Sequence, residues 1–81
     1  MKALVHVTLK ADVLDPQGKA IAHACAALGH AAVEGVRQGK FFEIEISAPD
    51  EAAARGVAEE VSEKLLANPV IEDYEILRIE P

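Results

Sequence analysis

The period of the hydrophobic positions changes several times along the chain, and each change predicts a structural element. Apolar and polar residues alternate in residues 2–10 and 40–46, which is typical of strands with one buried face. In residues 16–28 the apolar residues recur at helical spacing instead. The expected apolar stripe of this first helix consists of Ile21, Ala24, Cys25 and Leu28.

A second helix is expected after Ser47-Ala48-Pro49-Asp50, where Ser47 and Asp50 have capping-box-like spacing. Asn68-Pro69 ends this helix, because Pro cannot continue it. Its expected apolar stripe consists of Ala54, Val57, Ala58, Val61 and Leu65.

Residues 70–79 predict a turn followed by a last strand. Tyr74 and Ile76 fall on one face of this strand, and Leu77 and Ile79 fall on the other. A strand that is apolar on both faces needs cover on both sides. In so small a protein a second copy of the chain can supply one cover, and we expect last strands to pair across subunits.

The element order predicts an α+β fold. Residues 33–38 and 40–46 are expected to form a hairpin around Gln38-Gly39, which gives the order β-α-β-β-α-β. The expected architecture has two layers, ferredoxin-like or related, with a four-stranded antiparallel sheet and both helices on one face. We expect a single domain over residues 1–81.

Composition limits the size of the core and the class of partner. The chain has 81 residues with no Trp, one Tyr and two Phe, so its core must be thin and self-association is favoured. A net charge of −6 argues against nucleic acid and anionic membranes as partners. The single cysteine, Cys25, excludes an intrachain disulfide and a multi-cysteine metal site.

The N-terminal residues do not resemble a secretory signal. Polar residues interrupt the run that begins at Met1, and no stretch approaches the roughly 20 apolar residues of a membrane span. These features predict a cytoplasmic protein.

Candidate catalytic groups are few. His6, His23 and His30 have no carboxylate in an obvious triad relation, and Cys25 lies on an apolar stripe. We interpret these residues as surface or packing groups. The sequence therefore predicts no catalytic, cofactor-binding or metal-binding residue in this chain.

The strand-to-helix joint Val13-Leu14-Asp15-Pro16-Gln17-Gly18 has a strong helix start. Asp15 is expected to be the N-cap and Pro16 the first helical residue. Gly18 is a poor helix former in the first turn, which makes sense if another backbone or a partner comes close.

Three stretches together resemble the PurS family, the small S subunits of phosphoribosylformylglycinamidine synthase. They are the joint at residues 13–18, Val36-Arg37-Gln38-Gly39-Lys40, and Leu65-Leu66-Ala67-Asn68-Pro69-Val70-Ile71-Glu72-Asp73-Tyr74. Any one stretch would be a weak signal, but all three occur in order and at the spacing of the family. The resemblance covers nearly the whole chain.

The resemblance implies a non-catalytic subunit of a purine-biosynthetic, glutamine- and ATP-dependent ligase. That enzyme converts formylglycinamide ribonucleotide into formylglycinamidine ribonucleotide. ATP and Mg²⁺ are expected in the partner synthetase subunit, and ammonia comes from a glutaminase subunit. The small subunit is implied to form a homodimer or tetramer, to bridge the other two subunits and to support ammonia transfer. An alternative is a ferredoxin-like regulatory module that senses a small molecule.

The residues expected to contact partners lie in the three stretches. Arg37 and Lys40 are expected to meet an acidic or phosphate-bearing surface. The full set of expected contact residues is Asp15, Pro16, Gln17, Gly18, Arg37, Lys40, Asn68, Pro69, Glu72, Asp73 and Tyr74.

Overall fold

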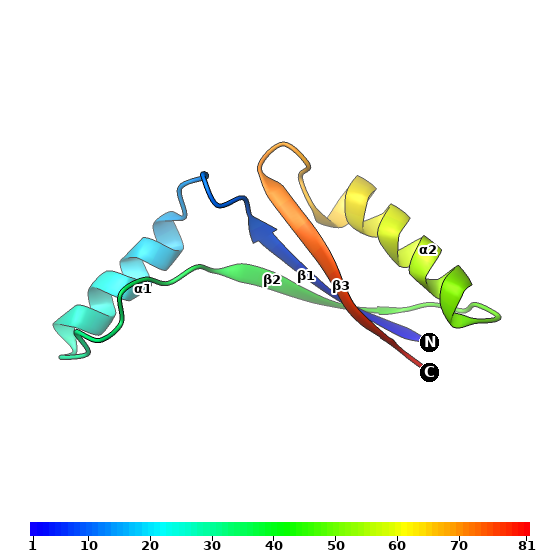
Figure 1. Cartoon of the computed structure of the whole chain (residues 1–81), viewed down its shortest axis with the longest axis horizontal. Coiled ribbons are helices and arrows are strands. Elements are labelled where there is room, and N and C mark those ends of the chain that lie inside the picture. Colours follow the sequence, from blue (N-terminus) through cyan, green and yellow to red (C-terminus); the bar gives the residue numbers. More distant parts are fainter.

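The computed structural model describes residues 1–81 and combines a three-stranded sheet with two helices (Figure 1). The α+β class and the antiparallel sheet are as predicted. A short π-helical turn, η1, continues the second helix without a break. The elements in chain order are β1 (Lys2–Leu9), α1 (Pro16–Ala27), β2 (Gly39–Glu45), α2 (Glu51–Val61), η1 (Ser62–Leu66) and β3 (Glu72–Glu80).

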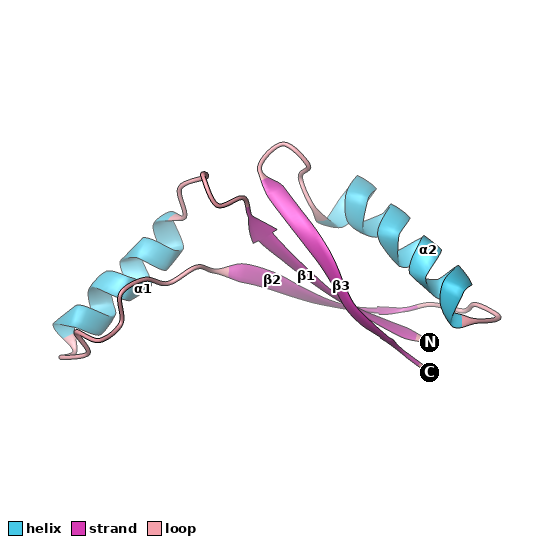
Figure 2. Cartoon of the chain, viewed as in Figure 1, coloured by secondary structure: helices cyan, strands magenta, loops and turns pink.

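The sheet has the order β2-β1-β3, with both pairs antiparallel. β1 is the central strand, and its residues Val5 and Val7 are almost fully buried. The expected strand at residues 33–38 does not form, so the hairpin prediction was wrong. Those residues instead run back along α1 to the start of β2 (Figure 2).

A register shift changes which residues of β3 face the core. Val5 of β1 pairs with Ile76, whereas Leu4 pairs with Arg78, so Leu77 is an extra residue in β3. This irregularity returns Ile79 to the same face as Ile76, because the alternation of side chains restarts after it. The prediction that Ile79 shares a face with Leu77 was therefore wrong. Leu77 does not share the face of Ile76 and Ile79, and it is 47% exposed.

α2 covers one face of the sheet through small residues. Ala54 and Ala58 are fully buried and pack in one cluster with Ala3 and Ile46. Alanine side chains allow a helix backbone to approach a sheet closely, which suits a core without large aromatic residues. A second cluster joins Val5 and Val7 to Ala67, at the end of the helical segment.

The turn η1 shifts the buried face of the second helix away from the predicted stripe. Ser62 is fully buried and Leu66 is half-buried, whereas Leu65 is 79% exposed. The buried positions Ala54, Ala58, Ser62 and Leu66 recur every four residues, a spacing that an α-helix cannot keep on one face. The wider π turn compensates for this drift. The helix begins at Glu51, and Asp50, not Ser47, is its N-cap.

α1 does not lie on the sheet, so the prediction that both helices cover one face was wrong. Figure 1 shows α1 projecting from one end of the sheet while α2 lies along the other part. The molecule measures 51 × 26 × 13 Å, and its radius of gyration is 16.0 Å. A compact chain of this length would have a radius of gyration of about 12 Å. We call α1 together with residues 28–36 the arm.

The arm leaves its apolar side chains uncovered. The helix forms as predicted, but the members of its expected apolar stripe are not buried: Ile21 is 45% exposed and Leu28 is 77% exposed. Gly29 ends the helix with a φ of +92°, the left-handed conformation expected for it. Neither helix combines the length and the apolar character needed to cross a bilayer.

Candidate functional site

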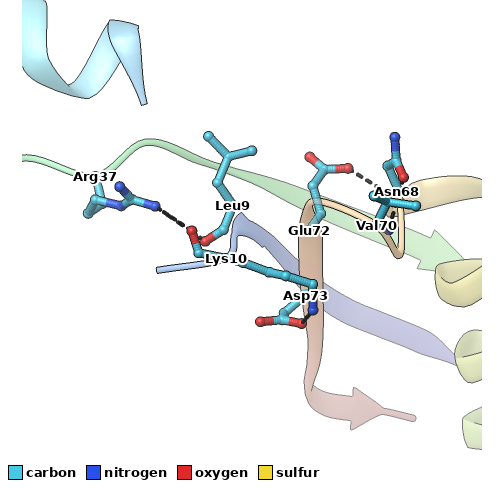
Figure 3. A network of polar contacts seen from close by, with 7 residues as sticks. All are labelled: Leu9, Lys10, Arg37, Asn68, Val70, Glu72 and Asp73. Atoms are coloured by element: carbon cyan, nitrogen blue, oxygen red, sulfur yellow. Dashed lines mark hydrogen bonds and ion pairs between the residues drawn. The ribbon is translucent and has the colours of Figure 1, made fainter. Parts of the chain in front are cut away.

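The three stretches singled out in the sequence meet at the end of β1, where the sheet gives way to the arm. Lys10 follows β1 directly, and its backbone N–H donates to the carbonyl of Ile71 at 2.8 Å. Its Nζ donates to Oδ1 of Asp73 at 2.7 Å (Figure 3). We call the groups around Leu9 and Lys10 the junction. It joins the arm, the sheet and the loop that follows η1.

Arg37 binds the junction from the arm side. Its guanidinium donates to the carbonyl oxygens of Lys10 at 3.0 Å and of Leu9 at 3.4 Å, as Figure 3 shows. A third hydrogen bond reaches the carbonyl of Val13 at 3.2 Å. The fork of a guanidinium suits this role, because it presents several donors in one plane. Arg37 is exposed, so the contact with an acidic or phosphate-bearing partner stays a prediction.

Asp15 lies at the end of the segment that leads from β1 to α1, and it is almost fully buried. It caps α1 as predicted, with Oδ1 accepting from the N–H of Gly18 at 2.9 Å. Oδ2 accepts from the N–H of Gln38 at 2.7 Å. These hydrogen bonds, Gln38 first and Gly18 second, lower the pKa of Asp15 despite the opposing effect of burial, and the charge of Arg37 adds to the lowering.

The close approach expected at Gly18 is confirmed, and it occurs within the chain. A Cβ atom at this position would lie 2.3 Å from the carbonyl oxygen of Val36. The returning limb of the arm therefore packs directly on the first turn of α1. Pro16 occupies the first helical position as predicted, and both Pro16 and Gln17 are exposed.

The third stretch forms a compact turn between η1 and β3. The N–H of Asn68 donates to Oε1 of Glu72 at 2.7 Å, and the carbonyl of Asn68 accepts from the N–H of Glu72 at 2.7 Å. Oδ1 of Asn68 also accepts from Val70 at 3.1 Å (Figure 3). Asn68 thus holds the turn through its side chain, with Pro69 exposed beside it.

The second and third stretches are linked by an ion pair. Nζ of Lys40 lies 3.5 Å from Oε2 of Glu72, whose side chain is mostly buried. A small cavity of about 190 Å³ lies beside this pair, lined also by Asp15 and Gln17. Tyr74 is half-buried and packs on the cluster of Val5 and Val7.

The structure therefore gathers the predicted contact residues into one region, where the polar side chains bind one another and the backbone. Its chemistry is that of a joint, which fixes the geometry of three segments. No sequence signal marks the part played by the Leu9, Lys10 and Val13 carbonyls, because any residue type supplies a carbonyl. No group of three or more His, Cys, Asp or Glu side chains is placed to hold a metal ion.

A large open groove of about 1120 Å³ runs along the arm. α1 contributes Lys19, Ala20 and His23, and the returning limb contributes Val33 and Val36. The sequence predicted the apolar stripe of α1 but not that it would stand away from the sheet. The groove and the exposed Ile21 and Leu28 make the arm an uncovered surface of the chain.

The family model PurS, described as phosphoribosylformylglycinamidine (FGAM) synthase, matches residues 2–80.

The chain belongs to the PurS family.

Sequence and structure agree on this membership of the PurS family. The chain is 51% identical over 77 residues to the phosphoribosylformylglycinamidine synthase subunit PurS of Mycobacterium leprae, covering 95% of this chain and 94% of that protein. The crystal structure of Methanocaldococcus jannaschii PurS, one of the subunits of formylglycinamide ribonucleotide amidotransferase in the purine biosynthetic pathway, is 43% identical. It superposes with a TM-score of 0.84 over 98% of both chains.

A PurS structure within a larger assembly is also similar. A chain in the structure of PurLQS from Thermotoga maritima is 27% identical and covers 98% of this chain and 99% of its own length. Its TM-score is 0.85. The arm and the sheet thus have the arrangement found in both of these solved structures.

Proposed function

We propose that the chain is a non-catalytic subunit of phosphoribosylformylglycinamidine synthase that bridges the synthetase and glutaminase subunits in the cytoplasm. In this role it serves the glutamine- and ATP-dependent conversion of formylglycinamide ribonucleotide into formylglycinamidine ribonucleotide. ATP and Mg²⁺ bind to the synthetase subunit, and this chain contributes protein contacts and helps to enclose the ammonia path.

One observation carries this proposal beyond family membership. The arm extends from the sheet with its apolar stripe uncovered, and a monomer gains nothing from exposing Ile21 and Leu28. Burial of apolar surface in a complex stabilises that complex by about 25 cal/mol per Å². The arm is therefore a surface for protein association, with a second copy of the chain and with the larger subunits as its partners.

Reconstitution tests the proposal. The synthetase and glutaminase are assayed for glutamine-dependent product formation with and without this chain. We expect full activity only in its presence. Full glutamine-dependent activity without it would overturn the proposal. An ammonia-dependent assay of the synthetase alone serves as the control that the synthetase is intact.

A charged residue on the stripe tests the role of the arm. Leu28→Asp is expected to weaken self-association and complex formation, because it places a carboxylate where an apolar contact forms. Leu65→Asp is the matched control, since Leu65 is equally exposed but lies on η1. Equal association of the native chain and Leu28→Asp would contradict the role of the arm.

Calorimetry separates this proposal from the alternative of a small-molecule sensor. The isolated chain is titrated with glutamine and with purine nucleotides. We expect no binding at micromolar concentration, whereas micromolar binding of either would favour the regulatory module.

A further inference from the structure

We propose that Arg37 and Asp15 form a two-sided clasp that holds the arm in one orientation, and that this orientation is what the arm's partners recognise. The inference rests on the function proposed above and names the residues that position the arm. Arg37 and Asp15 act here as positioning residues, because their effect on the partners passes through the orientation of the arm.

Few contacts other than those of Arg37 and Asp15 hold the arm to the rest of the chain. α1 makes no extensive contact with any strand or with α2. Gly18 is its only buried residue, and Gly18 contacts the arm's own returning limb. Two single connections, residues 10–15 and residues 37–38, attach the arm to the sheet. Without a further restraint, such connections would let the arm turn.

Hydrogen bonds of Arg37 and Asp15 tie the two connections to each other where the arm meets the sheet. Arg37 comes from the returning connection and binds the carbonyls of Lys10 and Val13 in the outgoing one. It also binds the carbonyl of Leu9 at the end of β1. Asp15 comes from the outgoing connection and binds the N–H of Gln38 in the returning one. The two residues therefore tie the connections in opposite directions, which resists both twisting and separation.

The clasp is separate from the hydrophobic clusters of the sheet. The clusters that stabilise the sheet consist of residues of the strands, of α2 and η1, and of the segments that follow β2 and η1, with no residue of the clasp. Loss of the Arg37 bonds should therefore free the arm without unfolding the sheet. If the arm then held the right orientation for only a tenth of the time, partner affinity would fall about tenfold.

The orientation of the arm is measured by pulsed electron spin resonance. Spin labels are attached to cysteines introduced by Ala26→Cys on α1 and Glu59→Cys on α2, because Ala26 and Glu59 are exposed. The native cysteine is removed by Cys25→Ala so that it takes no label. Labelled chain is diluted with unlabelled chain so that only distances within one chain are recorded. The 51 Å length of the molecule keeps the labels within the measurable range.

Arg37→Ala is compared with Arg55→Ala, which removes a half-buried arginine from α2. We expect Arg37→Ala to broaden the distance distribution and to weaken binding to the synthetase–glutaminase pair about tenfold. The thermal unfolding midpoints of Arg37→Ala and Arg55→Ala should be the same. Arg37→Lys should restore part of the narrow distance distribution and part of the affinity, since a lysine can reach one carbonyl but not three. This rescue separates positioning from a general loss of stability.

Two results would overturn the clasp. One is a distance distribution in Arg37→Ala as narrow as in the native chain. The other is a broadened distribution with native affinity, which would show that partners do not recognise the orientation. A native chain that fails to bind the larger subunits would overturn the proposed function instead, and the distances would still report on the clasp.

Discussion

The carboxylate of Asp15 accepts a hydrogen bond of 2.7 Å from the backbone N–H of Gln38, a residue 23 positions further along the chain. Its other oxygen accepts from Gly18 in the first turn of α1. One buried side chain thus serves as a helix cap and as a tie to the start of β2. A cap alone would need only one of these bonds.

Asp15→Asn is expected to speed amide hydrogen exchange at Gln38, because the amide side chain can present an oxygen to only one of the two N–H groups. Exchange is measured residue by residue by NMR. Asp50→Asn is the matched control, since Asp50 caps α2 through Ala53 without any second tie. Unchanged protection of Gln38 in Asp15→Asn would contradict the double role.

The ionisation of Asp15 gives a pH dependence with a defined sign. Its pKa in the folded chain is lowered from the ordinary value of 3.8, chiefly by the Gln38 and Gly18 hydrogen bonds. The carboxylate therefore stabilises the folded state fully above that ordinary value, and the contribution is lost as pH falls through the lowered pKa. NMR titration of the carboxyl carbon should give a lower midpoint in the folded chain than in urea. Equal midpoints would refute this.

Gly18→Ala and Gly56→Ala should change stability in opposite directions. Alanine is the better helix former at both positions. At Gly56 a Cβ meets nothing within 4 Å, so unfolding in urea should show a stabilisation of about 0.5–1 kcal/mol. At Gly18 a Cβ would collide with the Val36 carbonyl, and a loss of about 1–3 kcal/mol is expected. A stabilising Gly18→Ala would mean that the two limbs of the arm do not pack closely.

Ser62 offers a second stability test. Its hydroxyl is fully buried and has no hydrogen-bond partner. Ser62→Ala removes this unsatisfied group, so the free energy of unfolding should stay level or rise by about 1 kcal/mol. Ala58→Ser places a hydroxyl at an equally buried position one turn earlier and should destabilise. A clear loss of stability in Ser62→Ala would reveal a polar partner for the hydroxyl.

The last strand lies at the edge of the sheet, because β3 pairs only with β1. Its outer backbone groups are free to pair with the last strand of a second copy. We therefore expect an oligomer in sedimentation at micromolar concentration. A monomer at that concentration would exclude this pairing.

The local features of the fold could be predicted because they depend on neighbouring residues. The Asp15 cap, Pro16 at the first helical position and the left-handed Gly29 all follow from the chemistry of one or two side chains. The alternation in β1 likewise fixed the buried face of the central strand. Periodicity alone therefore gave the helices and the strands of the sheet to within a few residues.

The errors concern the relation between elements. An apolar stripe on α1 predicts that the stripe packs against another surface. The same residue pattern is expected whether that surface is the sheet of this chain or another chain. Residues 33–38 look like a strand but have no neighbour within this chain to pair with. The register shift opposite Leu4 depends on pairing between distant strands, which no local pattern records.

The candidate site shows the same limit. Family resemblance singled out three stretches that lie together in the structure, but it did not give their mutual arrangement. The hydrogen bonds of Arg37 end on backbone carbonyls, which carry no sequence signature. Partner contact by the predicted residues stays a prediction, because the polar groups seen here bind within the chain.

The length of the molecule has a consequence for how large enzymes are held together. A compact globule 51 Å across would need roughly 300 residues. This chain reaches that span with 81 residues by leaving one helix off its sheet. Two protein surfaces that lie too far apart for a compact domain of this mass can therefore be touched at the same time by opposite ends of one small chain.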